Sequence, residues 1–585
     1  MYTEQVGLCR RLLGEHYGPI VEAVGAALIR DGRLHLGSVV QRTGLAPGSV
    51  RQALAVLIQH GMATHAQTRE GGRAVTYYSI SPRSILRLQR AGLYLALVEE
   101  RMGRDGLAVF RTIMLNGCMT AAAARSALGA SERSGAAAKA KFGAAVAKLV
   151  RERFITAVAP RDTVTRADRI MQEEAKEIAK LGAPATPKDL ARIRQAIRQQ
   201  EAEESSSTAI VGLKRSAAAA ADDGGPAKVL IGPDGRPIML GNGLDGHGHG
   251  DGQGGGGGGG DAQPDTVDDK QCFRVYYERL DVFLRNKQIV NYFSDKYNAA
   301  AGVVLKAALR LTEAHTRTCR DRVSERITAN QIIQGIPHDA PLEDGVDTGD
   351  IPHSNGSDLS DGSGARRLQR GRAALALLEV LRADASGVLS RADERGAGVF
   401  RINFERAAGV LRDKCVDALV VEKHGSQHAR IVRVLRDKQK LDEKAVAHFA
   451  MLPIDQCRER LHELSLAGFV ATVEIPRTAD RNPSRMFYLW HVDAGRQVSA
   501  ALRLVFQGLS NVAQRAAREA SCRAPLLAKA QREDVVADPS LLTAPERKEL
   551  QAATAARRRL DIAAVRLDGM LLVVHDVAPS PVFGT

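Results

Sequence analysis

The segment that decides the fold is VATVEIPRTADRNPSRMFYLWHV, residues 470–492. Two runs of alternating apolar and polar residues, 471–475 and 486–492, predict two half-buried strands. The ten residues between them, 476–485, hold two prolines, an asparagine and an aspartate, which are typical of turns. The side chains expected to pack on the core are Val473, Ile475, Tyr488 and Trp490. The segment either simply closes a small domain or carries a basic loop for nucleic acid.

Three short helices are predicted upstream of this hairpin. Apolar residues recur at helical spacing within 431–435, 446–449 and 457–464. Pro453 suits the first turn of the third helix, and Gly468 can end it. Three helices, a strand, a loop and a strand are the order of a winged helix. Cys457 shares an apolar face with Leu461 and Leu464, so we expect it to be buried.

The same pattern recurs along the chain and predicts four tandem units. The first combines a stripe at 20–28, a short helix at 38–44, a third helix at 50–57 and a hairpin with TREGGR at its tip. The second shows no clear wing. The predicted fold class is mainly α with small β wings. The predicted domains are winged helices at 1–82, 90–160, 271–410 and 424–493, a low-complexity linker at 161–270, an acidic insert at 338–361 and a C-terminal helical hairpin or coiled coil at 494–580.

The linker and the insert differ in composition from the predicted helices. The linker contains EAEESSS and a glycine run, and only 187–200 is expected to be locally helical. The insert has seven acidic residues and neither lysine nor arginine. In the C-terminal hairpin, Thr543 and Glu546 have the spacing of a capping box.

The composition favours an anionic partner. The chain has 585 residues, a formal net charge of +15 and a pI near 9.6. Clustered lysine and arginine gain free energy when they displace the counterions of phosphates, although solvated arginines alone would also explain the charge. The seven cysteines form no CxxC pair, so we expect reduced thiols. No apolar run approaches the roughly 20 residues needed to span a bilayer, so no membrane partner is expected.

The sequence offers no motif of catalysis. GxSxG, HExxH and nucleophile–base patterns are absent, and the glycine run at 254–260 lacks the lysine of a phosphate loop. His247 and His249 lie in a glycine tract without further ligands. We therefore predict no catalytic residue, no cofactor and no metal site.

Arginines of the first and fourth units are the candidate DNA contacts, because the second helix of a helix-turn-helix can enter the major groove and the wing can meet phosphates. The candidates are Arg51, Arg69, Arg73, Arg477, Arg481 and Arg485. Solubility of exposed loops is the alternative explanation. The third helix of the first unit has one arginine and that of the fourth mixes signs, which favours protein binding by these helices.

Several blocks resemble one family. ARIVRVLRDKQKLDEKAVAHFAMLPIDQCRERLHELSLAGFVATVEIPRTADRNPSRMFYLWHVD closely resembles the winged-helix subunit of RNA polymerase III that is a member of its initiation heterotrimer. The blocks at 12–44, 50–62, 275–293 and 541–550 also match that family. The alanine-rich second unit matches least, and the linker and the insert depart from the family's usual composition.

The resemblance implies a non-catalytic polymerase subunit in the nucleus. It implies two partner subunits in a heterotrimer, which lies on the clamp of the largest subunit. It also implies contact with a TFIIIB-type initiation factor and promoter DNA, and a part in promoter opening. The alternative is a free-standing tandem winged-helix DNA-binding regulator, which has less need of the apolar C-terminal hairpin. The proteins that copurify with the chain would separate the two.

Overall fold

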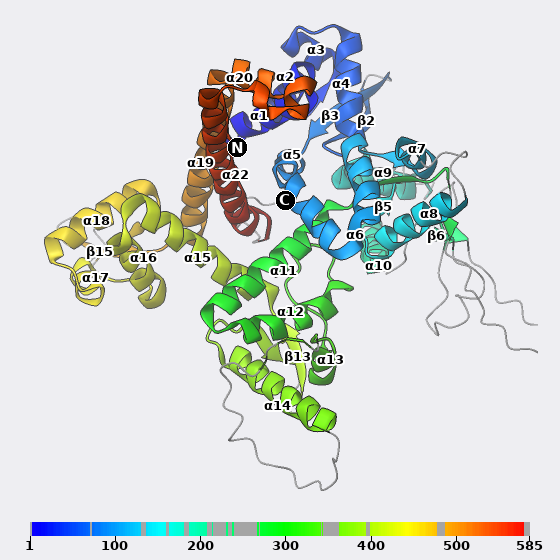
Figure 1. Cartoon of the computed structure of the whole chain (residues 1–585). Coiled ribbons are helices and arrows are strands. Elements are labelled where there is room, and N and C mark those ends of the chain that lie inside the picture. The colour runs from blue at the N-terminus through cyan, green and yellow to red at the C-terminus, as the bar shows by residue number, and fades with distance from the viewer. Residues whose placement is uncertain are drawn as a thin grey trace, which may run out of the picture. The chain divides into compact units, whose positions relative to one another are not determined.

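The computed structural model describes fifteen stretches of the chain. The chain divides into two compact units. One unit is Cys9–Tyr277, and the other combines Met1–Leu8 with Glu278–Thr585. The described residues are 3–70, 73–129, 136–158, 163–180, 186–206, 213–214, 230–231, 237–238, 266–267, 269–337, 339–340, 342, 362–392, 398–476 and 486–577. Most elements are helices and the sheets have two or three strands (Figure 1). The prediction of a mainly α fold with small β wings is confirmed.

The first winged helix follows the N-terminal helix α1 (Thr3–Tyr17). Its elements are α2 (Pro19–Asp31), β1 (Leu34–His35), α3 (Leu36–Thr43), α4 (Pro47–Gln59), β2 (Ala63–Glu70) and β3 (Arg73–Ile80). The sheet has the order β1-β3-β2, so the hairpin is the wing. Val50, Ala53, Leu54 and Leu57 are buried, as their spacing predicted. The chain continues through α5 (Pro82–Leu86) and η1 (Arg87–Arg90).

The second winged helix is completed by a strand from beyond the linker. Its elements are α6 (Ala91–Asn116), β4 (Met119–Thr120), α7 (Ala121–Ala127), α8 (Ala136–Arg151), β5 (Ile155–Ala157) and β10 (Cys272–Val275). β10 lies between β4 and β5, with Phe273 opposite both Met119 and Ala157. The predicted boundary at 271 assigned this strand to the third unit. Strand pairing tolerates such a long connection because the entropy of loop closure grows slowly with length.

Two helices lie within the predicted linker, α9 (Arg166–Lys180) and α10 (Pro187–Ser206). The local helix expected at 187–200 is confirmed, and α9 corrects the purely low-complexity interpretation. Leu190, Ile193 and Ile197 recur at helical spacing on α10, and Ile197 is buried. α10 contacts α9, where Arg194 pairs with Glu174. Short strand pairs complete the described linker: β6 (Leu213–Lys214) with β9 (Thr266–Val267), and β7 (Leu230–Ile231) with β8 (Pro237–Ile238).

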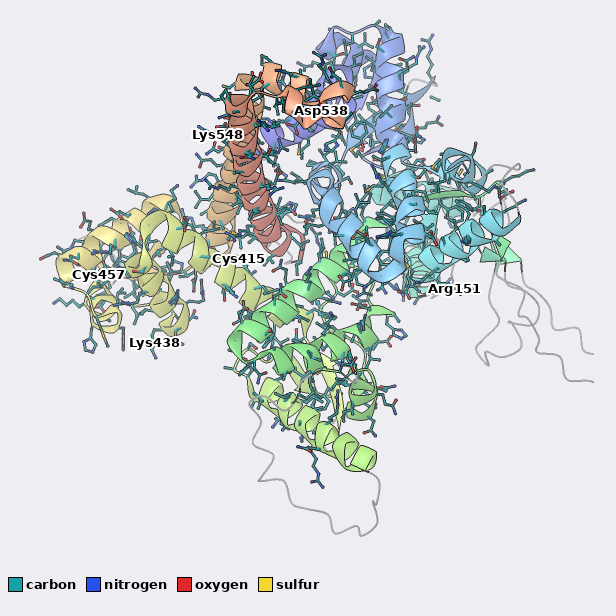
Figure 2. The ribbon with its side chains drawn as sticks, viewed as in Figure 1. Arg151, Cys415, Lys438, Cys457, Asp538 and Lys548 are labelled. Atoms are coloured by element: carbon teal, nitrogen blue, oxygen red, sulfur yellow. The ribbon has the colours of Figure 1, made fainter. Side chains whose placement is uncertain are left out.

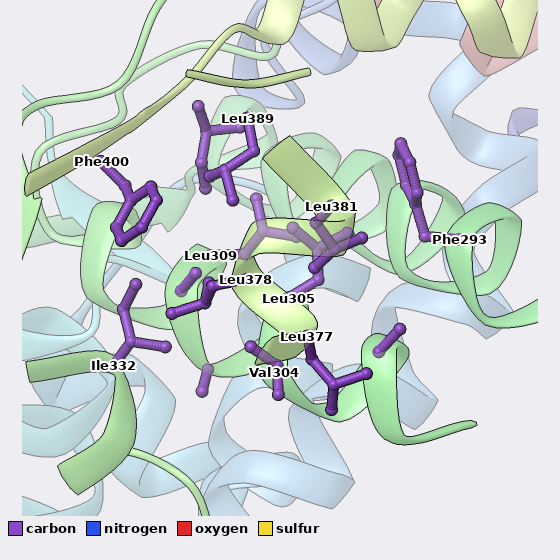
Figure 3. Packing of buried hydrophobic residues seen from close by; sticks show 14 of the residues in the cluster. Phe293, Val304, Leu305, Leu309, Ile332, Leu377, Leu378, Leu381, Leu389 and Phe400 are labelled. Carbon is purple, nitrogen blue, oxygen red and sulfur yellow. The ribbon is translucent and has the colours of Figure 1, made fainter. Parts of the chain in front are cut away.

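The third winged helix has the same order of elements. They are α11 (Tyr277–Lys296), α12 (Ala299–Glu313), β11 (Ile327–Thr328), α13 (Ala329–Gln334), α14 (Gly362–Ala383), β12 (Leu389–Arg391) and β13 (Val399–Ile402). Figure 3 shows its core, in which leucines of α12 and α14 lie between Phe293 and Phe400. Of the acidic insert predicted at 338–361, the structure describes 339–340 and 342.

α15 (Phe404–His424) leads to the fourth winged helix. Its elements are α16 (Ser426–Lys438), α17 (Glu443–Ala450), α18 (Ile454–Ala467), β14 (Ala471–Pro476) and β15 (Met486–His491). A single bridge between Leu441 and Trp490 stands where the other units have their first strand. The predicted hairpin and the burial of Cys457 and Trp490 are confirmed, and Val473 is half-buried.

The other two side chains expected to pack on that core are exposed. Ile475 and Tyr488 lie in the outer half of the hairpin. Alternation assigns a residue to a face of a strand, but only the inner residues of this hairpin have helices against them, so the prediction for these two side chains is wrong.

The C-terminal segment forms the predicted helical hairpin. α19 (Ala494–Cys522) and α22 (Ala544–Leu571) lie side by side (Figure 1). They are joined through α20 (Ala524–Ala530), α21 (Glu533–Ala537) and η5 (Pro539–Leu541), and η6 (Leu572–Val577) follows α22. The capping box of Thr543 and Glu546 is present. None of the helices in the described part of the chain combines the length and the apolar character needed to cross a bilayer.

Candidate nucleic-acid interface

In each winged helix, the helix that follows the turn is the element able to enter a DNA groove. In this chain these helices are α4, α8, α14 and α18. The charges on their exposed faces decide which of them can approach a phosphate backbone.

α8 has an exposed face of one sign. Lys141, Lys148 and Arg151 are exposed, and steps of seven and three residues place them along one side of the helix. Arg151 is labelled in Figure 2. Exposed Ala144 lies among them and leaves room for a close approach. From 138 to 151 the helix carries no carboxylate, and Glu152 follows it. We call Lys141, Lys148 and Arg151 the basic face of α8.

The core holds this face outward. The opposite side of α8 packs against α6 through buried apolar side chains, which are Phe142, Val146, Leu149 and Val150. These four residues recur at helical spacing. The same periodicity therefore fixes both the buried face and the direction of the three cations.

Asp269, which precedes β10, does not neutralise the positive charge of the basic face of α8. Arg125 donates two hydrogen bonds to its carboxylate, at 2.8 and 2.9 Å. These bonds, together with the charge of Lys139, hold the pKa of Asp269 below its ordinary value. The carboxylate is thus already compensated by Arg125, which belongs to α7.

The recognition helix of the first winged helix, α4, offers fewer cations than α8. Arg51 on α4 and Arg73 at the start of β3 are both exposed. Arg69 belongs to β2, but its side chain lies outside the described residues. The structure thus places Arg51 on α4 and both Arg69 and Arg73 on the wing, as predicted. Their contact with DNA stays a prediction.

α14 and α18 use most of their described arginines within the fold. On α14, Arg382 pairs with Glu379 at 2.5 Å, and Arg370 donates a hydrogen bond to the carbonyl oxygen of Pro337 at 2.7 Å. On α18, Arg458 pairs with Glu443 at 2.9 Å. The charged residues of α18 are Asp455, Arg458, Glu459, Arg460 and Glu463. With three carboxylates and two arginines, α18 has no cationic face to offer a phosphate.

The tip of the fourth wing lies outside the described residues. Arg477, Arg481 and Arg485 all fall within 477–485. The structure describes the two strands that flank this loop, but not the three side chains. Their contact with DNA stays a prediction.

One group of side chains in the fourth winged helix has donor types that a metal could use. One ligand atom of each of His424, His428 and Glu463 lies within 4.8 Å of the others. Neutral imidazole and carboxylate suit zinc, and burial and the nearby His428 lower the pKa of His424. The 2.7 Å hydrogen bond between His428 Nε2 and Glu463 explains that pair as a link between α16 and α18.

Sequence reasoning missed the basic face of α8. It used the apolar residues of this helix to find the fold and did not examine the positions between them. The signal was present in the sequence, since Lys141, Lys148 and Arg151 share a helical spacing that avoids every buried position.

Three family models match the sequence. The RNA polymerase III subunit RPC82 helix-turn-helix domain matches residues 7–68. The RNA polymerase III subunit RPC82 model matches residues 144–433. The C-terminal winged-helix domain of POLR3C matches residues 416–492, which include the hairpin β14–β15.

Curated relatives span nearly the whole chain. The DNA-directed RNA polymerase III subunit RPC3 of Danio rerio is 25% identical and the alignment covers 98% of both chains. The human protein of that name is 22% identical, again over 98% of both chains. The protein of that name from Yarrowia lipolytica is 32% identical over 34% of this chain and 33% of its own length.

Proposed function

This chain belongs to the RPC3 (RPC82) family of winged-helix subunits of RNA polymerase III, and from that premise we propose that it is a non-catalytic subunit that supports promoter-specific initiation and promoter opening. The non-catalytic part of the proposal rests on the missing motifs of nucleophile, metal site and phosphate loop in the sequence. Nuclear localisation follows from the polymerase that the relatives' names state.

The basic face of α8 is the observation that carries the DNA-binding part of the proposal. Three cations could neutralise at most three phosphates, and each contributes roughly 0.9 to the slope of log affinity against log salt. Such a contribution is too small for tight binding by one domain alone. It suits a surface that meets promoter DNA after the assembled polymerase has positioned it. Arg51, Arg69 and Arg73 in the first winged helix, and Arg477, Arg481 and Arg485 in the fourth wing, are proposed as weaker contacts of the same kind.

The C-terminal hairpin supports assembly with other subunits. On α22, Ile562 and Val565 are exposed one helical turn apart, although α19 covers another side of that helix. Exposed apolar residues at such spacing favour a protein partner over solvent. We assign this surface to the two partner subunits of a heterotrimer on the clamp of the largest subunit, with a TFIIIB-type factor as the partner during initiation.

We also propose the boundaries of the domains. Four winged helices are taken at 1–82, 90–160, 271–410 and 424–493, with the C-terminal hairpin at 494–580. β10 is added to the second unit because it pairs with β4 and β5. The segment between β5 and β10 then takes the position of that unit's wing.

Copurification tests the proposal. A tagged full-length chain expressed in its own cells should bring down the subunits of RNA polymerase III in constant proportion and at moderate salt. A monomeric chain without polymerase subunits, or a dimer on a palindromic DNA site, would support the free-standing regulator instead. Nucleotide polymerisation by the purified chain alone would contradict the non-catalytic role.

A further inference from the structure

The turn that joins α17 and α18 exposes apolar side chains. Phe449, Met451 and Ile454 are 46%, 85% and 37% exposed. They border an open depression of about 600 Å³, whose lining residues are Lys444, Ala447, His448, Phe449, Met451, Leu452 and Ile454. This volume lies within the range of binding pockets and can accept several side chains of a peptide.

Met451 adopts an unfavourable backbone conformation at this turn. It ends α17 in the left-handed region, at φ 53° and ψ 49°. The same position in the first winged helix, at the end of α3, is occupied by Gly44, with φ 68° and ψ 10°. Glycine adopts this conformation without steric cost, whereas methionine does not. Met451 therefore has a strained backbone, although its exposed side chain makes few contacts with the rest of the protein.

The lining of the depression carries a lysine and no carboxylate. Lys444 and His448 are its only titratable lining residues, and both are exposed. The ammonium group of Lys438, labelled in Figure 2, lies 5.8 Å from the centre of the Phe449 ring and 3.3 Å from the carboxylate of Asp437, with which it pairs. The neighbouring carboxylates already have partners: Asp442 accepts a hydrogen bond from the Ala445 N–H and Glu443 pairs with Arg458.

These features fit a polypeptide better than DNA or a second copy. α18, which begins at this turn, carries three carboxylates that would repel phosphates. A symmetric contact between two copies would set the same lysine-bearing surface against itself. A segment with carboxylates beside apolar side chains would pair with Lys444 and fill the depression with an apolar side chain.

We propose that the α17–α18 turn of the fourth winged helix is a docking site for an acidic, amphipathic segment of another protein. An apolar side chain of that segment enters the depression beside Phe449 and Met451. Its carboxylates lie near Lys444. This site is separate from the basic face of α8 and does not depend on any contact between the chain and DNA.

Site-specific photo-crosslinking in the purified full complex tests the proposal. A photo-crosslinking amino acid replaces Met451, and a matched probe replaces Leu466, which is 87% exposed on α18 but does not line the depression. Mass spectrometry then identifies the crosslinked segment. The expected product at 451 is a segment of another protein that is rich in Asp and Glu and contains large apolar residues. A product with nucleic acid, with a second copy or with a basic segment would overturn the proposal, as would equal yields at both positions.

Substitutions test whether this contact contributes binding energy. Met451→Gly and Lys444→Glu should each reduce retention of the crosslinked protein in the complex by about tenfold, as for central residues of an interface. Leu466→Ala should leave retention unchanged. Met451→Gly also removes the backbone strain, so thermal unfolding should show a fold at least as stable. Unchanged retention in both variants would overturn the proposal, because the folded turn would then be dispensable for docking.

Discussion

In the second winged helix the exposed side of α8 carries Lys141, Lys148 and Arg151, whereas α18 of the fourth carries three carboxylates and two arginines. Both helices follow a turn in the same order of elements, and both bury apolar residues at helical spacing. The core positions therefore set the fold, and the intervening positions set the class of partner. We propose that one repeated fold offers a phosphate-binding helix in one copy and a protein-binding turn in another.

The turns before α4 of the first winged helix and α18 of the fourth also differ. In the first winged helix a glycine ends α3, while in the fourth the exposed Met451 ends α17 in the same backbone region. The exposed, strained turn at Met451 is the one that we propose as a docking site for another protein.

The largest expected effect concerns the basic face of α8. Replacing Lys141, Lys148 and Arg151 by alanine should make the salt dependence of promoter-DNA binding by the assembled polymerase shallower by up to about 2.7, because each lost phosphate contact removes roughly 0.9. Alanine is a good helix former, so α8 should stay folded. The measurement is DNA affinity across a salt titration.

The matched control is the double variant Arg458→Ala and Arg460→Ala on α18. Because Arg458 pairs with Glu443 and Arg460 donates to the carbonyl oxygen of Gln456, the slope should not change. If the α8 and α18 variants lost equal slope, the proposed difference in phosphate binding between the second and fourth winged helices would be wrong.

The fourth wing could still bring its domain to DNA without α18. Arg477, Arg481 and Arg485 share their loop with Asp480, whose charge offsets one of them, so about two phosphate contacts are expected. Replacing the three arginines by alanine should remove these contacts and make the slope shallower by about 1.8. Promoter opening should weaken most at higher salt while the polymerase still assembles fully. Lost assembly would make the loop a protein contact. Unchanged opening throughout the titration would leave it as a solvated hairpin.

The sequence predicted the elements better than their connections. Spacing alone located α4, α18 and the strands of the fourth hairpin, because a buried face must repeat with the period of its element. It did not reveal that β10 joins the sheet of the second unit, since strand pairing across a long linker leaves no local pattern. Nor could alternation show that Ile475 and Tyr488 lie beyond the helices that would cover them.

The candidate sites were predicted unevenly for a similar reason. Arginines in wings stand out in a sequence, whereas the basic face of α8 appears only when its exposed positions are considered together. The strain at Met451 has no sequence signal, because the expected cue at a helix end is a glycine.

Substitution of Cys457 tests the apolar core of α18, the kind of buried helix face on which both the second and the fourth winged helices depend. Its side chain is fully buried on α18, and burial raises the pKa of the thiol, so it packs as a small apolar group without reactive character. Cys457→Ser should lower the free energy of unfolding by about 1–3 kcal/mol if the hydroxyl finds no partner. Thermal or denaturant unfolding measures this, with Cys522→Ser as control, since Cys522 is exposed. Equal stability of both variants would show that the face of α18 tolerates a polar atom.

The smallest expected effect lies at the two helix ends that differ between the first and fourth winged helices. Met451→Gly should raise the free energy of unfolding by about 0.5–1 kcal/mol, because glycine relieves the left-handed strain. Gly44→Ala should lower it by about 1 kcal/mol, since a Cβ there meets no atom within 4 Å and only the backbone conformation opposes it. Opposite signs in thermal unfolding would show that the two turns share one backbone requirement. A loss of stability in Met451→Gly would instead mean that the methionine packs on its own chain, and the argument that its exposure serves a partner would fail.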